Sequence, residues 1–322
     1  MEHLLEINDL AISFDTDLGE VKAVNGVSFY VDQGEIFGIV GESGSGKSVT
    51  TKAILKLGPE NERISSGEIL FEGKDILKLS EKELRDLRGN DIAMVFQDSL
   101  SALNPVYTVG KKMNELIRRH EKISKKEAKA KVLDLFDQVG IVDPERCYKS
   151  YPHELSGGMR QRIMIAMAIS CDPKLLIADE PTTALDVTIQ AQILHLLRDI
   201  QHEKKMSLII ITHDLGVIAQ MCSRVAVMRH GKIVEMGGIR EVFHHPQHPY
   251  TKELLAGMEE DAEIAANIES APSETTSEGD HFVSKDFLDS SDQDVKNQNV
   301  EKEGKNKSED NPVENPDDRQ EG

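Results

Sequence analysis

The chain opens with apolar residues that recur at nearly alternate positions and so predict an antiparallel strand. These residues are Leu4, Ile7, Leu10, Ile12 and Phe14. The polar segment 15–20 is typical of a turn, and a second strand is expected over residues 23–31. The next apolar run, 35–40, is short and ends at a glycine, which indicates a strand buried on both faces.

Two helix starts are marked by capping boxes. Ser80 and Ser124 are each followed three residues later by a glutamate, the pattern of a capping box. The second box opens a helix with one apolar stripe, formed by Ala128, Val132, Leu135, Phe136 and Val139. Residues 100–170, taken as a whole, show helical patterns and no convincing strand. They are predicted to form an inserted helical subdomain.

Two further apolar runs, 175–178 and 208–211, have the length of buried strands, and a helical pattern follows each of them. Strands that alternate with helices indicate an α/β core with a mostly parallel sheet. The predicted fold is therefore an α/β domain with an antiparallel β subdomain at its start and a helical insertion.

The composition changes after Met258. Residues 259–322 contain 20 acidic and 6 basic residues, a net charge of −14 out of −19 for the whole chain. Few apolar residues are present to offset the entropy of ordering, so residues 259–322 are predicted to form a disordered acidic tail. The alternative is a short helix around the apolar cluster at 282–288 that docks on a partner.

Bulk properties exclude several classes of protein. No run of about 18 apolar residues is present, and the acidic start of the chain does not match a signal peptide. The three cysteines, Cys147, Cys171 and Cys222, are too widely spaced for a zinc site or a disulfide framework. The net negative charge makes nucleic acid an unsuitable partner.

A glycine-rich phosphate loop follows the run 35–40. It matches the pattern G-x-x-x-x-G-K-[ST] and consists of Gly41, Glu42, Ser43, Gly44, Ser45, Gly46, Lys47 and Ser48. Such a loop wraps backbone N–H groups around phosphate oxygens, and the helix that follows adds the positive end of its dipole. Lys47 is expected to reach the β- and γ-phosphates, and Ser48 is expected to bind Mg²⁺. The motif predicts binding of ATP or GTP.

Two adjacent carboxylates, Asp179 and Glu180, end the apolar run that begins at Leu175. Asp179 is suited to hold Mg²⁺ beside the hydroxyl of Ser48. Glu180 is one residue further and faces the other side of the strand, where it can accept the proton of an attacking water.

A second phosphate-binding helix start is predicted at Ser156, Gly157 and Gly158, in the segment 155–162. The chain already has one loop for a γ-phosphate, so this second site is expected to serve the nucleotide of another subunit. A dimer with ATP between the subunits follows from that interpretation.

In these motifs the chain resembles the nucleotide-binding subunit of an ABC transporter, over residues 4–257. The resemblance implies that Gln97 joins Mg²⁺ and faces the membrane subunit, that His213 senses the γ-phosphate, and that Phe14 stacks on adenine. It also implies an ATPase domain over residues 1–258, with ATP and Mg²⁺ as ligands.

Segments 151–162 and 178–192 and the tag at 248–251 resemble the oligopeptide and dipeptide importers more narrowly, in particular their D-type ATPase subunit. That resemblance implies two membrane permeases, a second, F-type ATPase subunit, an indirect link to an extracellular substrate-binding protein, and a position on the cytoplasmic side of the cell membrane. The importer tag is expected over residues 246–257.

Two alternatives remain at this point. Nickel and glutathione importers resemble the same group, and the ATPase does not touch the cargo. The second alternative is a non-transport ABC ATPase. Such proteins carry a second ATP cassette or zinc modules, and the sequence contains neither.

Overall fold

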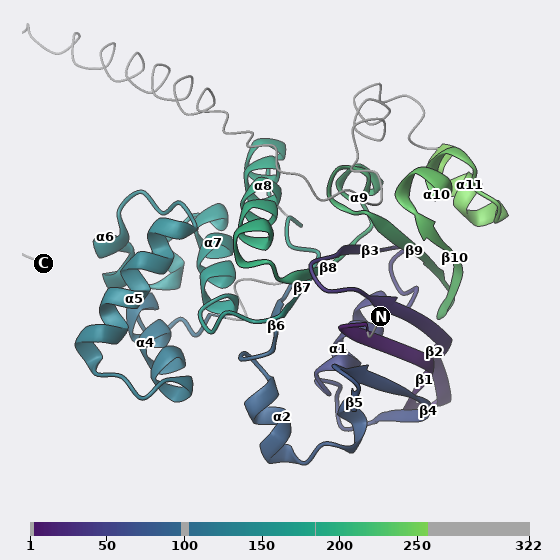
Figure 1. The fold of residues 1–322 in the computed structure, drawn as a ribbon, viewed down its shortest axis with the longest axis horizontal. Coiled ribbons are helices and arrows are strands. Elements are labelled where there is room, and N and C mark those ends of the chain that lie inside the picture. The colour runs from purple at the N-terminus through teal and green to yellow at the C-terminus, as the bar shows by residue number, and fades with distance from the viewer. Residues whose placement is uncertain (1–2, 98–102, 184, 257–322) are drawn as a thin grey trace, which may run out of the picture. The chain divides into compact units, whose positions relative to one another are not determined.

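The computed structural model describes residues 3–97, 103–183 and 185–256. All of them belong to one compact unit, Met1–Glu274. Figure 1 shows the order of the elements along the chain, with antiparallel strands first and helices α4–α7 between strands β6 and β7.

Four strands form an antiparallel sheet in the order β2-β1-β4-β5. Their bounds are β1 Leu5–Thr16, β2 Gly19–Val31, β4 Glu62–Phe71 and β5 Lys74–Asp75. Strands β1 and β2 form a hairpin in which Thr16 pairs with Gly19, so the predicted turn lies between these residues. The expected N-terminal antiparallel β subdomain is confirmed.

A second sheet has six strands in the order β10-β9-β3-β8-β7-β6. Their bounds are β3 Ile36–Val40, β6 Ile92–Val95, β7 Leu175–Asp179, β8 Ser207–Thr212, β9 Arg224–Arg229 and β10 Lys232–Gly238. Every pair is parallel except β9 with β10. The predicted buried strands are therefore β3, β7 and β8, and they lie in the middle of this sheet.

The six-stranded sheet separates two hydrophobic cores. Side chains along a strand alternate between its faces, and in β7 Leu176 and Ala178 belong to one core while Leu175 and Ile177 belong to the other. The first core includes most of the helices. The second includes the antiparallel sheet and helix α1. Burial on both faces explains why these strands read as unbroken apolar runs.

All the regular elements that the structure describes between β6 and β7 are helical, as the sequence predicts. Its helices are α4 Val109–His120, α5 Lys125–Gln138, α6 Pro144–Lys149 and α7 Gly157–Ala168, with a 3₁₀ turn, η2, at Pro152–Glu154. Figure 1 shows α4, α5 and α6 gathered beside α7. The capping box at Ser124 is present, and the predicted apolar stripe of α5 is buried.

The remaining helices surround the sheets. They are α1 Lys47–Ile54, η1 Ile76–Lys78, α2 Glu81–Leu87, α8 Val187–Lys204, α9 Leu215–Met221, α10 Ile239–His244 and α11 Pro249–Ala256. Helix α2 begins at the other predicted capping box, Ser80. No helix of the described ranges is long and apolar enough to cross a membrane. The prediction for residues 259–322 lies outside the described residues.

Candidate nucleotide-binding site

The phosphate loop joins β3 to α1, so a rigid strand leads into it and a helix N-terminus ends it. Gly46 has φ 104° and caps α1 without any side-chain hydrogen bond, which leaves the N–H groups of the first turn available to an anion. A Cβ on Gly46 would lie 2.7 Å from the carbonyl oxygen of Ala23. The close approach of strand β2 therefore requires glycine at this position.

Lys47 lies almost entirely inside the loop, with 5% of its surface exposed. Its ammonium group donates hydrogen bonds to the carbonyl oxygens of Gly41, at 2.6 Å, and Glu42, at 2.8 Å. Burial lowers the pKa of Lys47, and the nearby carboxylates of Glu180 and Asp179 oppose that shift. The loop thus holds a desolvated cation at its centre.

Ser48 and Asp179 meet as the sequence predicts. The Ser48 hydroxyl donates to the Asp179 carboxylate at 2.8 Å. Asp179 is 2% exposed, and burial raises its pKa, against the effect of the Ser48 hydrogen bond. A hydroxyl and a buried carboxylate side by side offer hard oxygen ligands, the kind that Mg²⁺ prefers. These side chains therefore fit the predicted metal site.

Glu180 follows β7 directly and has a left-handed backbone, φ 47°, which is uncommon for a residue with a side chain. The Gln97 amide donates to its carboxylate at 2.7 Å, and Nδ1 of His213 lies 3.3 Å from its other oxygen. Gln97 follows β6 and His213 follows β8, the neighbours of β7 on either side. Since parallel strands end at the same edge of a sheet, the three predicted catalytic residues converge there.

The structure also brings in residues to which the sequence assigned no part in the site. The Thr183 hydroxyl donates to the Glu180 carboxylate at 2.8 Å. The Gln190 amide donates to Asp214 at 3.1 Å and so links α8 to the start of α9. Thr183 could have been suspected from its place three residues after Glu180. Gln190 gives no such signal, because its partner comes from a distant segment.

Phe14 and the 156–158 segment are not placed in contact with the carboxylates. Phe14 is half-buried on β1 and pairs with Val21, two residues from the Ala23 carbonyl that abuts the phosphate loop. Ser156 caps α7 by accepting the N–H of Met159 at 3.3 Å. Gly157 and Gly158 form the first turn of α7, and a Cβ on Gly158 would meet Ile189 of α8 at 2.8 Å.

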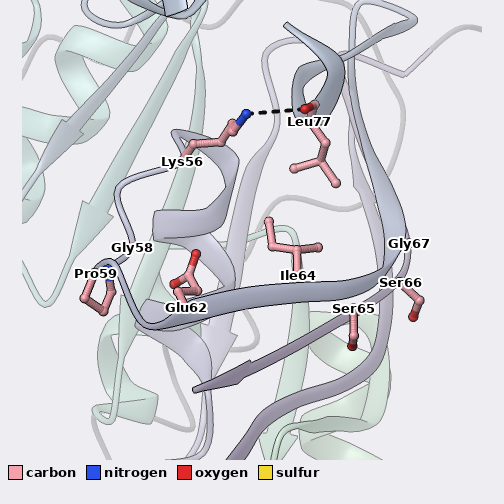
Figure 2. Close-up of a pocket in the computed structure, with 9 residues that line it drawn as sticks. All are labelled: Lys56, Gly58, Pro59, Glu62, Ile64, Ser65, Ser66, Gly67 and Leu77. Carbon is pink, nitrogen blue, oxygen red and sulfur yellow. Dashed lines mark hydrogen bonds between the residues drawn. The ribbon is translucent and has the colours of Figure 1, made fainter. Parts of the chain in front are cut away.

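One surface hollow lies elsewhere. Figure 2 shows it between the end of α1, strand β4 and η1, where Lys56 donates to the carbonyl oxygen of Leu77 at 3.3 Å. None of the predicted site residues lines it. The phosphate loop and the predicted residues Gln97, Asp179, Glu180 and His213 instead lie at the carboxyl ends of strands in the six-stranded sheet.

A phosphate loop after a buried parallel strand, with a carboxylate of a nearby strand on the loop serine, defines a P-loop nucleoside triphosphatase. A family model described as ABC transporter matches residues 24–183. The chain belongs to the ABC transporter family and is an ATP-binding, ATP-hydrolysing member of it.

Similar proteins agree with this assignment. The chain is 58% identical over 256 residues to the oligopeptide transport ATP-binding protein OppD of Bacillus subtilis, an alignment that covers 79% of this chain and 72% of OppD. It is 55% identical over 259 residues to the dipeptide transport ATP-binding protein DppD of the same organism, covering 80% and 77%.

Among solved structures, the ATP-binding cassette MJ0796 in a dimeric post-hydrolysis state bound to ADP and Pi matches with a TM-score of 0.66. The sequence identity is 25%, and the match covers 73% of this chain and 98% of that one. The expected fold class and family resemblance are both confirmed.

Proposed function

We propose that the chain is the motor subunit that powers import of oligopeptides or dipeptides across the cell membrane. The observation that carries the ATPase part is the convergence of Gln97 and His213 on the carboxylate of Glu180, beside the Ser48–Asp179 pair. The peptide cargo rests on the likeness to OppD and DppD, whose names describe oligopeptide and dipeptide transport.

Glu180 is the proton acceptor in this proposal. The Gln97 amide and the Thr183 hydroxyl both donate to its Oε2 atom, which leaves Oε1 to face a water. That water attacks the γ-phosphorus of ATP and transfers its proton to Glu180, a general-base step, while the bond between the γ-phosphorus and the bridging oxygen breaks and ADP leaves with that oxygen. His213, next to Oε1, senses the γ-phosphate. The Lys47 cation stabilises the negative charge of that phosphate.

Ser48, Asp179 and Gln97 would hold Mg²⁺, as their hydroxyl, carboxylate and amide oxygens suit it. When bound with ATP, Mg²⁺ would supply positive charge that offsets the negative charge of the phosphates. The residues Gly41–Ser48 cradle the phosphates through backbone N–H groups, and Phe14 stacks on the adenine ring.

The 156–158 segment completes the site of a second ATPase subunit. Ser156, Gly157 and Gly158 open helix α7 with exposed or half-exposed positions, so a nucleotide on a facing subunit can reach its N-terminus. We propose that the facing subunit is a related F-type ATPase, because the motifs are of the D type. The dimeric cassette among the similar structures supports the general arrangement.

A groove supports contact with a membrane permease. It lies between the end of α1, strand β6 and helices α4 and α7, and its lining includes Leu57, Met94, Phe96, Leu116, Met167 and Cys171. Phe96 precedes Gln97 directly, so an occupant of the groove is one residue from the group that contacts Glu180. Each of the two permeases would occupy this groove in one of the two ATPase subunits. The chain would then sit on the cytoplasmic side of the membrane, with the extracellular substrate-binding protein reached only through them.

The proposed domain limits follow from the same features. The ATPase domain covers residues 1–258, with the helical subdomain at about 100–170 and the importer tag at 246–257. Residues 259–322 form a separate acidic tail.

Transport by the assembled complex in proteoliposomes tests the proposal. Labelled oligopeptide and dipeptide should accumulate in the compartment that contains the ATP, which corresponds to the cytoplasm. Glu180→Gln should abolish that uptake. Uptake of nickel or glutathione without uptake of peptide would show that the proposed cargo is wrong and the proposed motor role is right. An active ATPase that assembles with no permease would support a non-transport role.

The identity of the second subunit is tested separately. The Glu180→Gln chain, purified alone with ATP, is expected to remain monomeric by light scattering and to dimerise when the F-type subunit is added. A tight homodimer would show that one gene product supplies both halves.

A further inference from the structure

The importer tag reaches back to the phosphate loop. Tyr250 lies at the start of α11, and its hydroxyl accepts a hydrogen bond from the backbone N–H of Glu42 at 3.1 Å. These residues are 208 positions apart. The tag therefore touches the nucleotide site, although the motifs of that site all lie before residue 214.

Burial and contacts with neighbouring strands hold Tyr250 in a fixed position. It is 1% exposed, and the guanidinium of Arg229 lies over its ring, 4.4 Å from the centroid. Arg229 ends β9, and the preceding residue, Met228, packs its carbonyl oxygen against Gly41. Glu235 of β10 anchors the other side of the tag by accepting the N–H groups of Gln247, at 2.7 Å, and His248, at 3.0 Å.

The Gly41–Glu42 peptide group is bonded at both of its ends. Its N–H donates to Tyr250, and its carbonyl oxygen accepts the 2.6 Å hydrogen bond from Lys47. A trans peptide is planar, so its N–H and C=O point in opposite directions and turn together. The orientation that Tyr250 gives to the N–H is therefore also the orientation of the carbonyl that holds Lys47.

We propose that Tyr250 is a positioning residue for ATP binding, which acts by fixing the Gly41–Glu42 peptide and, through it, Lys47. Without the hydroxyl, the peptide can rotate and the binding-competent loop becomes one of several conformations. Apparent affinity then falls in proportion to the population that is lost. The chemical step is unaffected, because Tyr250 contacts neither Glu180 nor its partners. The inference concerns ATP affinity and holds whatever the cargo is.

Tyr250→Phe is the test, since phenylalanine keeps the ring under Arg229 and removes only the hydroxyl. The net value of one hydrogen bond predicts an increase of about fivefold in Kd for a fluorescent ATP analogue on the full-length chain. In the assembled complex KM should rise by a similar factor, while kcat at saturating ATP stays within about twofold of wild type. Hydrogen exchange of the Glu42 amide should accelerate in the absence of nucleotide.

Tyr148→Phe is the matched control. Tyr148 accepts a hydrogen bond from Asn114 within the helical subdomain, so the control loses a bonded hydroxyl far along the chain from the loop. It should leave Kd and the Glu42 exchange rate unchanged. An unchanged Kd in Tyr250→Phe overturns the inference. So does a weaker Kd with unchanged Glu42 exchange, because the effect would not act through this peptide. A lower kcat with normal KM does so too, by placing Tyr250 in the chemical step.

Discussion

Glu180 combines a left-handed backbone with a carboxylate that two side-chain donors hold. Glu180→Gln keeps the shape of the side chain and removes its ability to accept a proton. We expect ATP binding by the full chain to be retained and steady-state hydrolysis by the assembled complex to fall by about 10²–10⁴-fold.

Glu62→Gln is the control for that substitution. Glu62 lines the hollow of Figure 2, apart from the phosphate loop, and burial raises its pKa. Its loss of charge should leave turnover unchanged. Hydrolysis at a wild-type rate in Glu180→Gln would remove Glu180 from the role of general base.

The three cysteines differ in accessibility, which allows a second test on single residues. Cys147 and Cys222 are buried, and burial raises the pKa of Cys147 to about 11 and that of Cys222 further still. Cys171 is only half-buried and lines the proposed permease groove. N-ethylmaleimide at neutral pH should therefore add slowly to Cys171 and to neither of the others in the native chain, as intact-mass measurement will show.

Assembly with the permeases should protect Cys171 from that reaction. Cys171→Ser provides the blank, because it should take up no label until the chain is denatured. Equal labelling of Cys171 in the free chain and in the complex would mean that the permeases do not occupy the groove.

At the scale of elements, helix α5 offers a clean measurement of capping. The Ser124 hydroxyl accepts the N–H of Glu127, and the Glu127 carboxylate accepts the N–H of Ser124. Ser124→Ala should lower the free energy of unfolding by about 1 kcal/mol, the usual cost of losing an N-cap. Urea titration measures it. Thr108→Ala is the matched control, since Thr108 caps α4 without a side-chain hydrogen bond and should cost less.

The same box carries a pH dependence. Hydrogen bonds from the Ser124 side chain and then its backbone lower the pKa of Glu127 below its ordinary value of 4.5. A lowered pKa in the folded state means that the stabilisation is complete above the ordinary value and is lost as pH falls through the lowered one. The difference between wild type and Ser124→Ala should therefore shrink in acid. A constant difference would mean that the Glu127 half of the box contributes nothing.

Periodicity predicted the elements with a strong local signal. Strands β3, β7 and β8 are buried on both faces, and the capping boxes at Ser80 and Ser124 need only four adjacent residues. Strands β9 and β10 were not predicted, and β10 lies at an edge where none of its residues is buried. Its alternation is correspondingly weak.

The candidate site also contains residues that the sequence could predict and contacts that it could not. Lys47, Ser48 and Asp179 were predictable because phosphate and metal chemistry restrict their spacing. The contacts of Gln97 with Glu180 and of Tyr250 with Glu42 depend on strand order and on packing between distant segments. No local pattern encodes those distances.

For the whole molecule, the position of the chemistry predicts the effect of truncation. The site residues lie between Phe14 and His213, and the last contact with the phosphate loop comes from Tyr250. Removal of residues 270–322 should leave ATP affinity, ATPase activity of the complex and peptide uptake within about twofold of the full chain, because the acidic, apolar-poor composition of this segment predicts no packed core.

Rates of uptake and hydrolysis by the truncated complex decide the matter. A shorter truncation that removes only residues 290–322 and keeps the apolar cluster at 282–288 is the control. If the longer truncation changes either rate and the shorter one does not, the cluster docks on a partner and regulates turnover.

The alternation of β7 between two cores restricts which changes of length the gene can accept. Gain or loss of one codon within Leu175–Asp179 would move every later side chain of the strand to the opposite core and would swing Asp179 away from Ser48. Substitutions there can be absorbed one at a time, but a change of length cannot. The turn between Thr16 and Gly19, where Leu18 is fully exposed, carries no such constraint. Among natural variants, insertions and deletions should therefore collect in that turn and be missing from β7.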